Sequence, residues 1–307
     1  MAADAPNAKQ RYRGRKSHGT FYLTVTPFFA IFTLFSIFPV AFSLYLGFNK
    51  WDGFSDPAFV GLENYVRALS DPVFQKAIWN TLFLWFWSTL LTVGLALVLA
   101  VLINEYVVFG KTYFRMVFLM PLLVAPAVAA IILRIFFTSN GGLVNLFTGA
   151  LTGTPSYFDW LGSEFWIKPL VVLLVVWRWT GWHMIIFLAG LQSIPRDIYE
   201  AARIDGVGRW AIFSRITVPL LLPALAFSII TATLGGLQMF DEPYVLSQGL
   251  GGTDNSATTI GMYLYATAFT QFNFGLGAAV SWYIFAAVVA LTVLYQAVTR
   301  RLAGATA

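Results

Sequence analysis

The sequence contains no cysteine, few charged residues and only two histidines, and each shortage argues against a class of protein. Without cysteine the chain cannot form disulfides, cysteine-ligated zinc sites, iron–sulfur clusters or a thiol nucleophile. Charged residues make up 11% of the chain, against about 25% in an ordinary soluble domain, which argues against a soluble globular fold. His18 lies in a basic tail and His183 in an apolar run, so the histidine–glutamate helical metal pair of a membrane metalloprotease is missing.

Hydrophobic residues make up 58% of the 307 residues and gather in six long runs. A helix needs about 20 apolar residues to cross a bilayer, because lipid cannot satisfy bare peptide groups. The first run is far longer than a signal-peptide core of roughly 7–15 residues, so we expect it to be retained. The predicted fold class is all-α, a polytopic membrane protein with spans near residues 21–48, 78–103, 116–137, 169–192, 219–240 and 276–299.

The positive residues are distributed unevenly among the loops, which sets the predicted orientation. Loops that stay in the cytoplasm keep more lysine and arginine than loops on the other side. Both termini are therefore expected in the cytoplasm, with most carboxylates outside. This distribution accounts for the net charge of +5, so the charge does not indicate a nucleic-acid partner. The residues assigned to the cytoplasmic side are the basic tail 1–20, Lys111, Arg115, Arg196, Arg203, Arg209, Arg215, Arg300, Arg301 and the C-terminal tail 303–307.

Several polar residues and segments lie near the outer ends of the predicted spans. Apolar residues at 62, 65, 66 and 69 recur with helical spacing, which predicts a short interfacial anchoring helix. The loop 247–256 is rich in glycine and small polar residues, so we expect it to be flexible and exposed. Asn80, Asn104 and Asn273 lie near span ends and are expected to be caps and interfacial hydrogen-bond donors rather than ligands.

The segment 193–218 is a long polar stretch between the fourth and fifth runs. Ser193 is expected to cap a helix with Pro195 in its first turn. Gly206 is expected to end this helix in the left-handed conformation. A second amphipathic helix should run over 209–218 and stop at Pro219. A simple loop needs only a few residues, so an ordered helix–turn–helix of this length suggests a partner.

Charged residues follow one stripe of the first of these helices. Arg196, Glu200 and Arg203 lie at i, i+4 and i+7, where they can form alternating ion pairs. Small residues at 201 and 202 lie on another stripe, where a partner's backbone could come close.

This segment resembles the EAA loop of bacterial and archaeal ABC-importer permeases, whose pattern is E-A-A, three residues, G, nine residues and I-x-L-P. Glu200, Ala201, Ala202 and Gly206 match with that spacing, and the sequence ITVP at 216–219 closes it with valine in place of the usual leucine. Other stretches, including FVGLENY, MPLLVAPAVAA, LAGLQSIP and FDEPYVLSQG, are similar to the carbohydrate-uptake subgroup. The resemblance extends over residues 21–302.

The resemblance implies a six-helix type I permease domain over 21–302 that forms half of a translocation pathway for a sugar or sugar-like solute. It also implies a second permease, two copies of an ATPase and an extracytoplasmic binding protein, in a bacterial or archaeal cytoplasmic membrane. Glu200 would make the polar contact with the ATPase, Ala201 and Ala202 would pack closely against it, and Asp205 with Gly206 would set the turn.

The chain does not supply a nucleotide site of its own. Gly110, Lys111 and Thr112 match the end of a phosphate-binding loop, but Glu105 stands where the first glycine is required. ATP and magnesium are therefore expected to be used by the partner ATPase, and no cofactor, metal or catalytic residue is assigned to this chain.

Polar groups within spans are costly and usually face a bundle interior or a wet cavity. Arg178 lies deep in the fourth run, either at a cavity or partner contact or in an internal ion pair. Together with Arg178, the residues assigned to a substrate pathway are Trp182, Gln238, Phe240 and Asp241, since aromatic faces and polar side chains suit a sugar. A contact of the residues near 241 with the binding protein is an equal alternative.

Two other functions remain as rivals. An ion-coupled secondary transporter acting alone would need a coupling carboxylate within the membrane, and Asp241 and Glu242 lie only at a span end. A purely structural membrane protein would not explain the ordered segment 193–218.

Replacing Gly206 with valine is expected to uncouple ATP hydrolysis from transport, because a β-branched residue resists the left-handed conformation. The variant should still insert into the membrane. Solute uptake and ATPase activity of the assembled transporter measure the effect, and unchanged uptake would count against the assignment of the loop.

Overall fold

The chain divides into two compact units, Met1–Tyr45 and Leu46–Ala307. A computed structural model describes residues 18–105 and 109–304, so most of the predicted basic tail and the last three residues lie outside the described part. The first unit consists of α1 (His18–Phe32), a π-helical turn (Thr33–Ile37) and most of α2 (Phe38–Gly47). These form one apolar helical stretch, Phe21–Gly47, that is long enough to cross a membrane.

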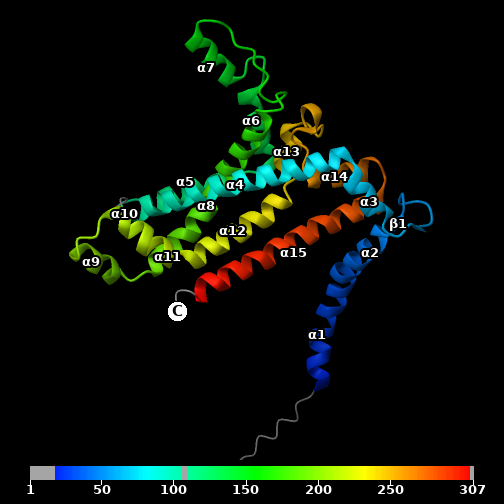
Figure 1. The fold of residues 1–307 in the computed structure, drawn as a ribbon, viewed down its shortest axis with the longest axis horizontal. Coiled ribbons are helices and arrows are strands. Elements are labelled where there is room, and N and C mark those ends of the chain that lie inside the picture. The colour runs from blue at the N-terminus through cyan, green and yellow to red at the C-terminus, as the bar shows by residue number, and fades with distance from the viewer. Residues whose placement is uncertain (1–17, 106–108, 305–307) are drawn as a thin grey trace, which may run out of the picture. The chain divides into compact units, whose positions relative to one another are not determined.

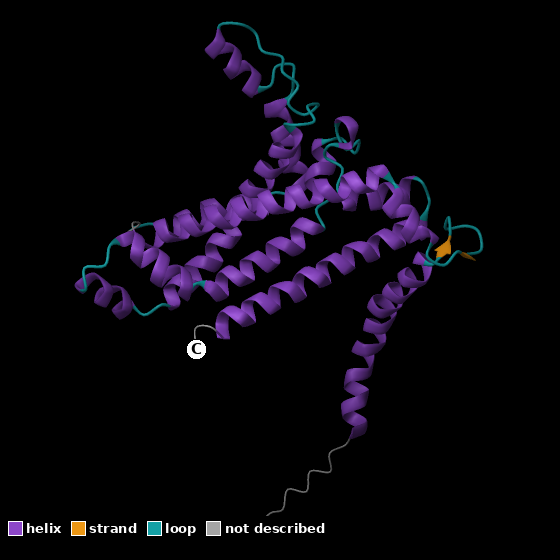
Figure 2. Cartoon of the chain, in the orientation of Figure 1, coloured by secondary structure: helices purple, strands orange, loops and turns teal. Residues whose placement is uncertain are grey.

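The second unit is built from long apolar helices, as Figures 1 and 2 show. Its unbroken spans are α4 (Pro72–Glu105), α8 (Ile167–Ser193) and α15 (Phe274–Gly304). The helix α4 packs along α8 and α12 (Leu222–Leu237), and α12 also packs along α15. The helix α4 begins six residues before the predicted boundary, because the Asp71 carboxylate accepts a hydrogen bond from the Val73 backbone N–H (2.8 Å) and Pro72 occupies the first turn.

Two of the six predicted spans are broken. The pair α5 (Lys111–Leu123) and α6 (Pro126–Phe137) bends by 93°. Pro126 disfavours helical geometry in the preceding residue, and Val124 and Ala125 are accordingly extended (ψ 127° and 138°). Within the described residues, four helices are long and apolar enough to cross a membrane, or up to six when each bent pair counts as one span.

The other bend, of 67°, falls at Leu221 between α11 (Val218–Leu220) and α12. The prediction that the preceding helix stops at Pro219 is wrong. The helix α10 (Arg209–Ile212) continues through a π-helical turn (Phe213–Thr217) into α11. A π turn shifts the backbone hydrogen-bond register by one residue. With this shift the helix continues past Pro219, which has no backbone N–H to donate.

Short elements cover the ends of the spans on the predicted outer side. The predicted interfacial helix is present as α3 (Glu63–Ser70), and the strands β1 (Asn49–Lys50) and β2 (Ala58–Phe59) pair before it. The Asn64 amide fixes α3 by donating to the backbone oxygens of Gly47 (3.1 Å) and Asn49 (2.9 Å). The remaining short helices are α7 (Leu143–Thr152), α9 (Arg196–Ile204), α13 (Asp241–Leu246), a 3₁₀ turn (Thr253–Asn255), α14 (Ile260–Tyr265) and a π turn (Ala266–Thr270).

The loop 247–256 is more tightly held than its composition predicted. The Asn80 amide donates to the backbone oxygens of Asn255 (2.8 Å) and Thr258 (2.9 Å), and Lys76 forms an ion pair with Asp254. Asn80 is therefore not a cap, because α4 starts a full two turns earlier and leaves its amide free for these tertiary contacts. The expected cap by Asn273 is confirmed, since its side-chain oxygen accepts from the Leu276 N–H (3.3 Å).

The close approach of α5 to α8 depends on one glycine. A β-carbon at Gly181 would overlap the backbone carbonyl of Phe118, whereas a β-carbon at Gly94 on α4 would meet nothing within 4 Å. Small residues allow helix backbones to approach closely in membranes, so Gly181 sets the distance between these two helices.

Gly181→Ala is therefore expected to destabilise the protein by about 1–3 kcal/mol, because α5 must move away from α8. Gly94→Ala is the matched control and should leave the melting temperature unchanged or raise it slightly. Thermal unfolding of the detergent-solubilised proteins measures the melting temperature of each variant. Equal melting temperatures for the Gly181 and Gly94 variants would show that α5 and α8 are not in tight contact at Gly181.

Candidate functional site

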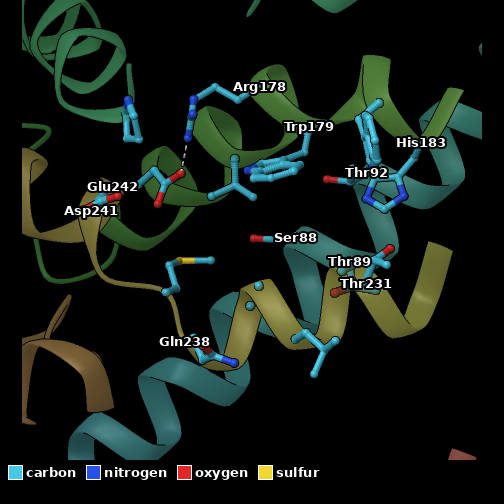
Figure 3. Close-up of a pocket in the computed structure, with 18 of the residues that line it drawn as sticks. Ser88, Thr89, Thr92, Arg178, Trp179, His183, Thr231, Gln238, Asp241 and Glu242 are labelled. Carbon is cyan, nitrogen blue, oxygen red and sulfur yellow. Dashed lines mark hydrogen bonds and ion pairs between the residues drawn. The ribbon is translucent and has the colours of Figure 1, made fainter. Parts of the chain in front are cut away.

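A cavity of about 440 Å³ lies between α4, α8, α12 and the first residues of α13. Its volume falls within the range of small-molecule sites. Figure 3 shows its polar side chains, which come from helices far apart in the sequence. The cavity therefore has the size and the polar groups of a solute site.

The structure brings together all of the residues assigned to the substrate pathway. The side chains of Arg178, Trp182, Gln238, Phe240 and Asp241 all line the cavity. Trp182, Gln238 and Asp241 are exposed, whereas Arg178 is buried with 5% of its surface accessible. The segment 238–240 between α12 and α13 is not helical, and this interruption turns the polar residues toward the cavity.

Arg178 makes a buried ion pair with Glu242 at one end of the cavity. One terminal nitrogen, Nη1, lies 2.6 Å from Glu242 Oε1, and both side chains are about nine-tenths buried or more. The two interpretations of Arg178 are thus both realised, since the residue forms an internal ion pair and also lines the cavity.

Glu242 lies beyond the end of a span, as the sequence predicts, but its carboxylate is buried. The residue follows the end of α12 in the sequence, but α13 turns back so that its carboxylate meets α8. Burying a lone carboxylate is costly, whereas a nearby guanidinium compensates much of that cost.

The second terminal nitrogen of Arg178 reaches the break between α5 and α6. Its Nη2 donates to the Val124 carbonyl oxygen at 3.4 Å. This carbonyl is next to the 93° bend, where a continuous helix can no longer supply a hydrogen-bond donor. A single guanidinium therefore ties together α8, α13 and the break in the third span.

Two buried hydroxyls that line the cavity were not predicted from the sequence. Ser88 and Thr92 lie one helical turn apart on α4, and His183 lines the same cavity from α8. Their side chains are nearly fully buried, and Ser88 Oγ, Thr92 Oγ1 and His183 Nδ1 have no hydrogen-bond partner among the described residues. The i, i+4 spacing of two hydroxyls in an otherwise apolar run was the signal that could have identified them.

Aromatic rings form part of the cavity surface. Trp179 and Trp182 line it from α8. Phe240 lines it from the other side and stacks on Tyr244, with ring centroids 4.8 Å apart and an interplanar angle of 27°. Flat apolar rings beside hydrogen-bonding groups suit a ligand with both apolar ring faces and polar edges.

A second candidate site is the helix α9, which carries the residues assigned to ATPase coupling. Its start differs from the prediction, because Ser193 is the last residue of α8 and donates its hydroxyl to the Gly190 carbonyl (2.7 Å). Pro195 forces Ile194 into an extended conformation (ψ 124°), so the break falls one residue later and Pro195 itself precedes the first turn of α9.

The end of α9 agrees with the prediction. Gly206 has φ +73°, and two backbone hydrogen bonds close the helix end, from Gly206 N to Arg203 O (3.1 Å) and from Val207 N to Ala202 O (3.0 Å). These are the two bonds of a Schellman motif, which requires a left-handed residue at this position. The angle between α9 and α10 is thereby fixed by the backbone.

Most of the surface of α9 is open to a partner. Glu200, Ala201, Asp205 and Gly206 are exposed, while Ala202 is buried within this chain. The large apolar side chains of Ile204 and Trp210 are 85% and 77% exposed.

The expected ion pairs among Arg196, Glu200 and Arg203 do not form in the described part of the chain. Pairs on an exposed helix face contribute little energy, so the side chains stay free for other contacts. The Tyr199 hydroxyl instead lies 3.3 Å from Thr217 Oγ1 and joins α9 to the π turn.

Neither region resembles a metal site. Among residues 18–105 and 109–304, no three histidine, aspartate or glutamate side chains gather closely enough to hold a metal ion.

Comparisons with known proteins extend over most of the chain. A family described as the binding-protein-dependent transport system inner membrane component matches residues 93–304. The lactose transport system permease protein LacF of Rhizobium radiobacter is 36% identical over 275 residues, which cover 89% of this chain and 91% of LacF. The arabinooligosaccharides transport system permease protein AraP of Bacillus subtilis is 35% identical over 260 residues, which cover 84% of this chain and 82% of AraP.

A solved structure has the same fold. It is a chain of a bacterial alginate ABC transporter in complex with an alginate pentasaccharide-bound periplasmic protein. The TM-score is 0.80 at 22% sequence identity, and the match covers 92% of this chain and 95% of that one.

Replacing one partner of the ion pair between Arg178 and Glu242 is expected to destabilise the protein more than replacing both partners. Arg178→Met alone should cost roughly 3–5 kcal/mol, because it leaves Glu242 buried without a cation. The double variant Arg178→Met, Glu242→Met should recover most of this loss. A double-mutant cycle of unfolding measurements in detergent tests the pair, and additive losses would show that the two charges do not interact.

Proposed function

Because this chain belongs to the family of inner-membrane components of binding-protein-dependent transport systems, we propose that its cavity lies on the translocation pathway of a sugar or sugar-like solute. The family membership confirms the resemblance to ABC-importer permeases and the predicted all-α, polytopic fold. The chain is the permease that forms half of the pathway, and ATP is hydrolysed by a separate subunit.

The side chains that line the cavity are the main support for a sugar as the solute. Hydroxyl, amide and imidazole groups lie beside Trp179 and Trp182, an arrangement that matches the polar edges and apolar faces of sugar rings. The relatives LacF and AraP are named for lactose and for arabinooligosaccharides, which supports the same class of solute.

The helix α9 is the proposed docking element for the ATPase. Its exposed Glu200 would make the polar contact, and Ala201 would allow close packing. Asp205 and Gly206 would hold the turn, while Ala202 would act from within the chain as the acceptor of the Val207 N–H. The exposed rings and alkyl groups of Ile204 and Trp210 would add apolar area to the interface.

The proposed assembly contains a second permease subunit, two copies of the ATPase and an extracytoplasmic solute-binding protein, with lipid around the spans. ATP and magnesium would be held by the ATPase, and this chain would bind no cofactor. The proposed location is the cytoplasmic (inner) membrane of a bacterium or archaeon, with α9 on the cytoplasmic side.

The buried carboxylate of Glu242 favours a second candidate, an ion-coupled transporter acting alone. Such transporters use membrane-buried acidic residues as proton or cation relays. Glu242 is already paired with Arg178 at 2.6 Å, however, so a fixed cation of the protein already occupies the carboxylate that a transported cation would need. The ATP-driven permease therefore explains more of the structure.

Reconstitution of the complex that co-purifies with this chain tests the proposed function. Uptake of radiolabelled lactose or arabinooligosaccharides into proteoliposomes is expected to require ATP and the binding protein, and to persist when ionophores collapse ion gradients. The alternative would be correct if this chain alone accumulated sugar in response to a proton or sodium gradient.

A further inference from the structure

Four buried polar side chains without a hydrogen-bond partner surround the same cavity. Ser88 Oγ, Thr92 Oγ1, Arg178 Nε and His183 Nδ1 all lack a partner among the described residues, and all four side chains line the cavity. Each residue exposes 5% of its surface or less. Buried polar atoms are normally paired, so their concentration here indicates a ligand that supplies hydrogen bonds.

These groups are arranged along the cavity rather than at one point. Figure 3 shows Thr92 and His183 toward one end, Ser88 between the ends, and Arg178 with Glu242 at the other. A hydroxyl can both donate and accept a hydrogen bond. Hydroxyl groups spaced along a ligand would match this row better than a single charged group would.

The guanidinium of Arg178 is not free to recognise a carboxylate. Arginine binds carboxylates most strongly through two parallel N–H groups, but Nη1 of Arg178 is held by Glu242 and Nη2 points to the Val124 carbonyl. Only the single N–H at Nε is left without a partner among the described residues.

The remaining charge at the cavity is negative. The charged side chains that line the cavity are one cation, Arg178, and two carboxylates, Glu242 and Asp241. Asp241 is exposed and forms no ion pair within the described part of the chain. An acidic ligand in the cavity would be repelled by this uncompensated charge.

We infer that the cavity binds uncharged, polyhydroxylated solutes directly and discriminates against acidic sugars. Ser88, Thr92 and His183 contact the ligand hydroxyls, and the Arg178–Glu242 pair with Asp241 rejects carboxylates. The inference rests on the proposed function, since the cavity must lie on the path of the solute. It assigns part of the selectivity to the permease itself.

Binding to the purified permease–ATPase complex without the binding protein tests the inference. The probes are radiolabelled lactose and a matched disaccharide in which one ring carries a uronic acid. The complex is expected to bind lactose at least about tenfold more tightly than the acidic probe, which corresponds to about 1.4 kcal/mol.

The hydroxyl row is tested with Ser88→Ala and Thr92→Val, which remove a hydroxyl with little change in shape. Each should weaken lactose binding by about fivefold, the effect of one lost hydrogen bond. The control is Thr292→Val on α15, because its hydroxyl already donates to Val288 O (2.8 Å) and does not line the cavity. This control should bind lactose as the unaltered chain does.

The charge arrangement is tested separately. Asp241→Asn removes the unpaired charge from an exposed position, and Glu242→Gln releases the Arg178 guanidinium. Both should narrow the ratio between the lactose and acidic-probe affinities by about threefold or more. Asp241→Asn alone decides this point if Glu242→Gln fails to fold, since Asp241 is not in the buried pair.

The inference would be overturned if the unaltered complex bound the two probes equally. It would also be overturned if neither hydroxyl variant bound lactose more weakly than the unaltered complex. Sugar uptake by the complete transporter would still support the proposed function in either case. Absence of uptake of every sugar by the complete transporter would instead overturn the proposed function.

Discussion

The ion pair between Arg178 and Glu242 is the interaction on which the shape of the candidate site depends. It connects the middle of α8 with the start of α13, and the same guanidinium reaches the Val124 carbonyl at the break in the third span. Charges within a membrane protein are costly unless they are paired, so each partner restrains the other. Without its partner, either charge would be buried and uncompensated at this end of the cavity.

The same need to satisfy polar groups explains how the interrupted helices are tolerated. The break at Val124 leaves a backbone carbonyl without a helical partner, a situation that lipid cannot relieve, whereas at Leu221 the backbone N–H and carbonyl keep their partners, Thr217 O and Leu225 N (both 2.9 Å). Arg178 supplies one donor at the first break. At the interruption after α12, the Thr259 hydroxyl donates to the Met239 carbonyl (2.8 Å). The non-helical residues 238–240 line the cavity beside the polar side chains that α4 and α8 supply.

The two functional regions are connected by the turn after α9 and the helical segments from α10 to α12. The Schellman motif at Gly206 fixes α9 against α10, and Tyr199 contacts Thr217 at the end of the π turn. The chain then passes through the bend at Leu221 into α12, where Thr231 lines the cavity, and Gln238 just after α12 lines it too. A displacement of α9 by a partner would therefore reach the cavity along a single covalent path with one bend.

The sequence by itself determined the membrane class, the approximate spans and the end of α9. These follow from local rules, because hydrophobic length and a left-handed glycine act within a few residues. The five residues assigned to a substrate pathway, from Arg178 to Asp241, were selected for their polar or aromatic side chains near apolar runs, and all five line the cavity.

Only the tertiary structure decided what those residues contact. The partner of Arg178 lies 64 positions away, and the amide of Asn80 bonds a carbonyl 175 positions away. Helical periodicity carries no information about such distances. The hydroxyls of Ser88 and Thr92 gain their meaning in the same way, because they lie at a cavity that exists only when α4, α8 and α12 are assembled.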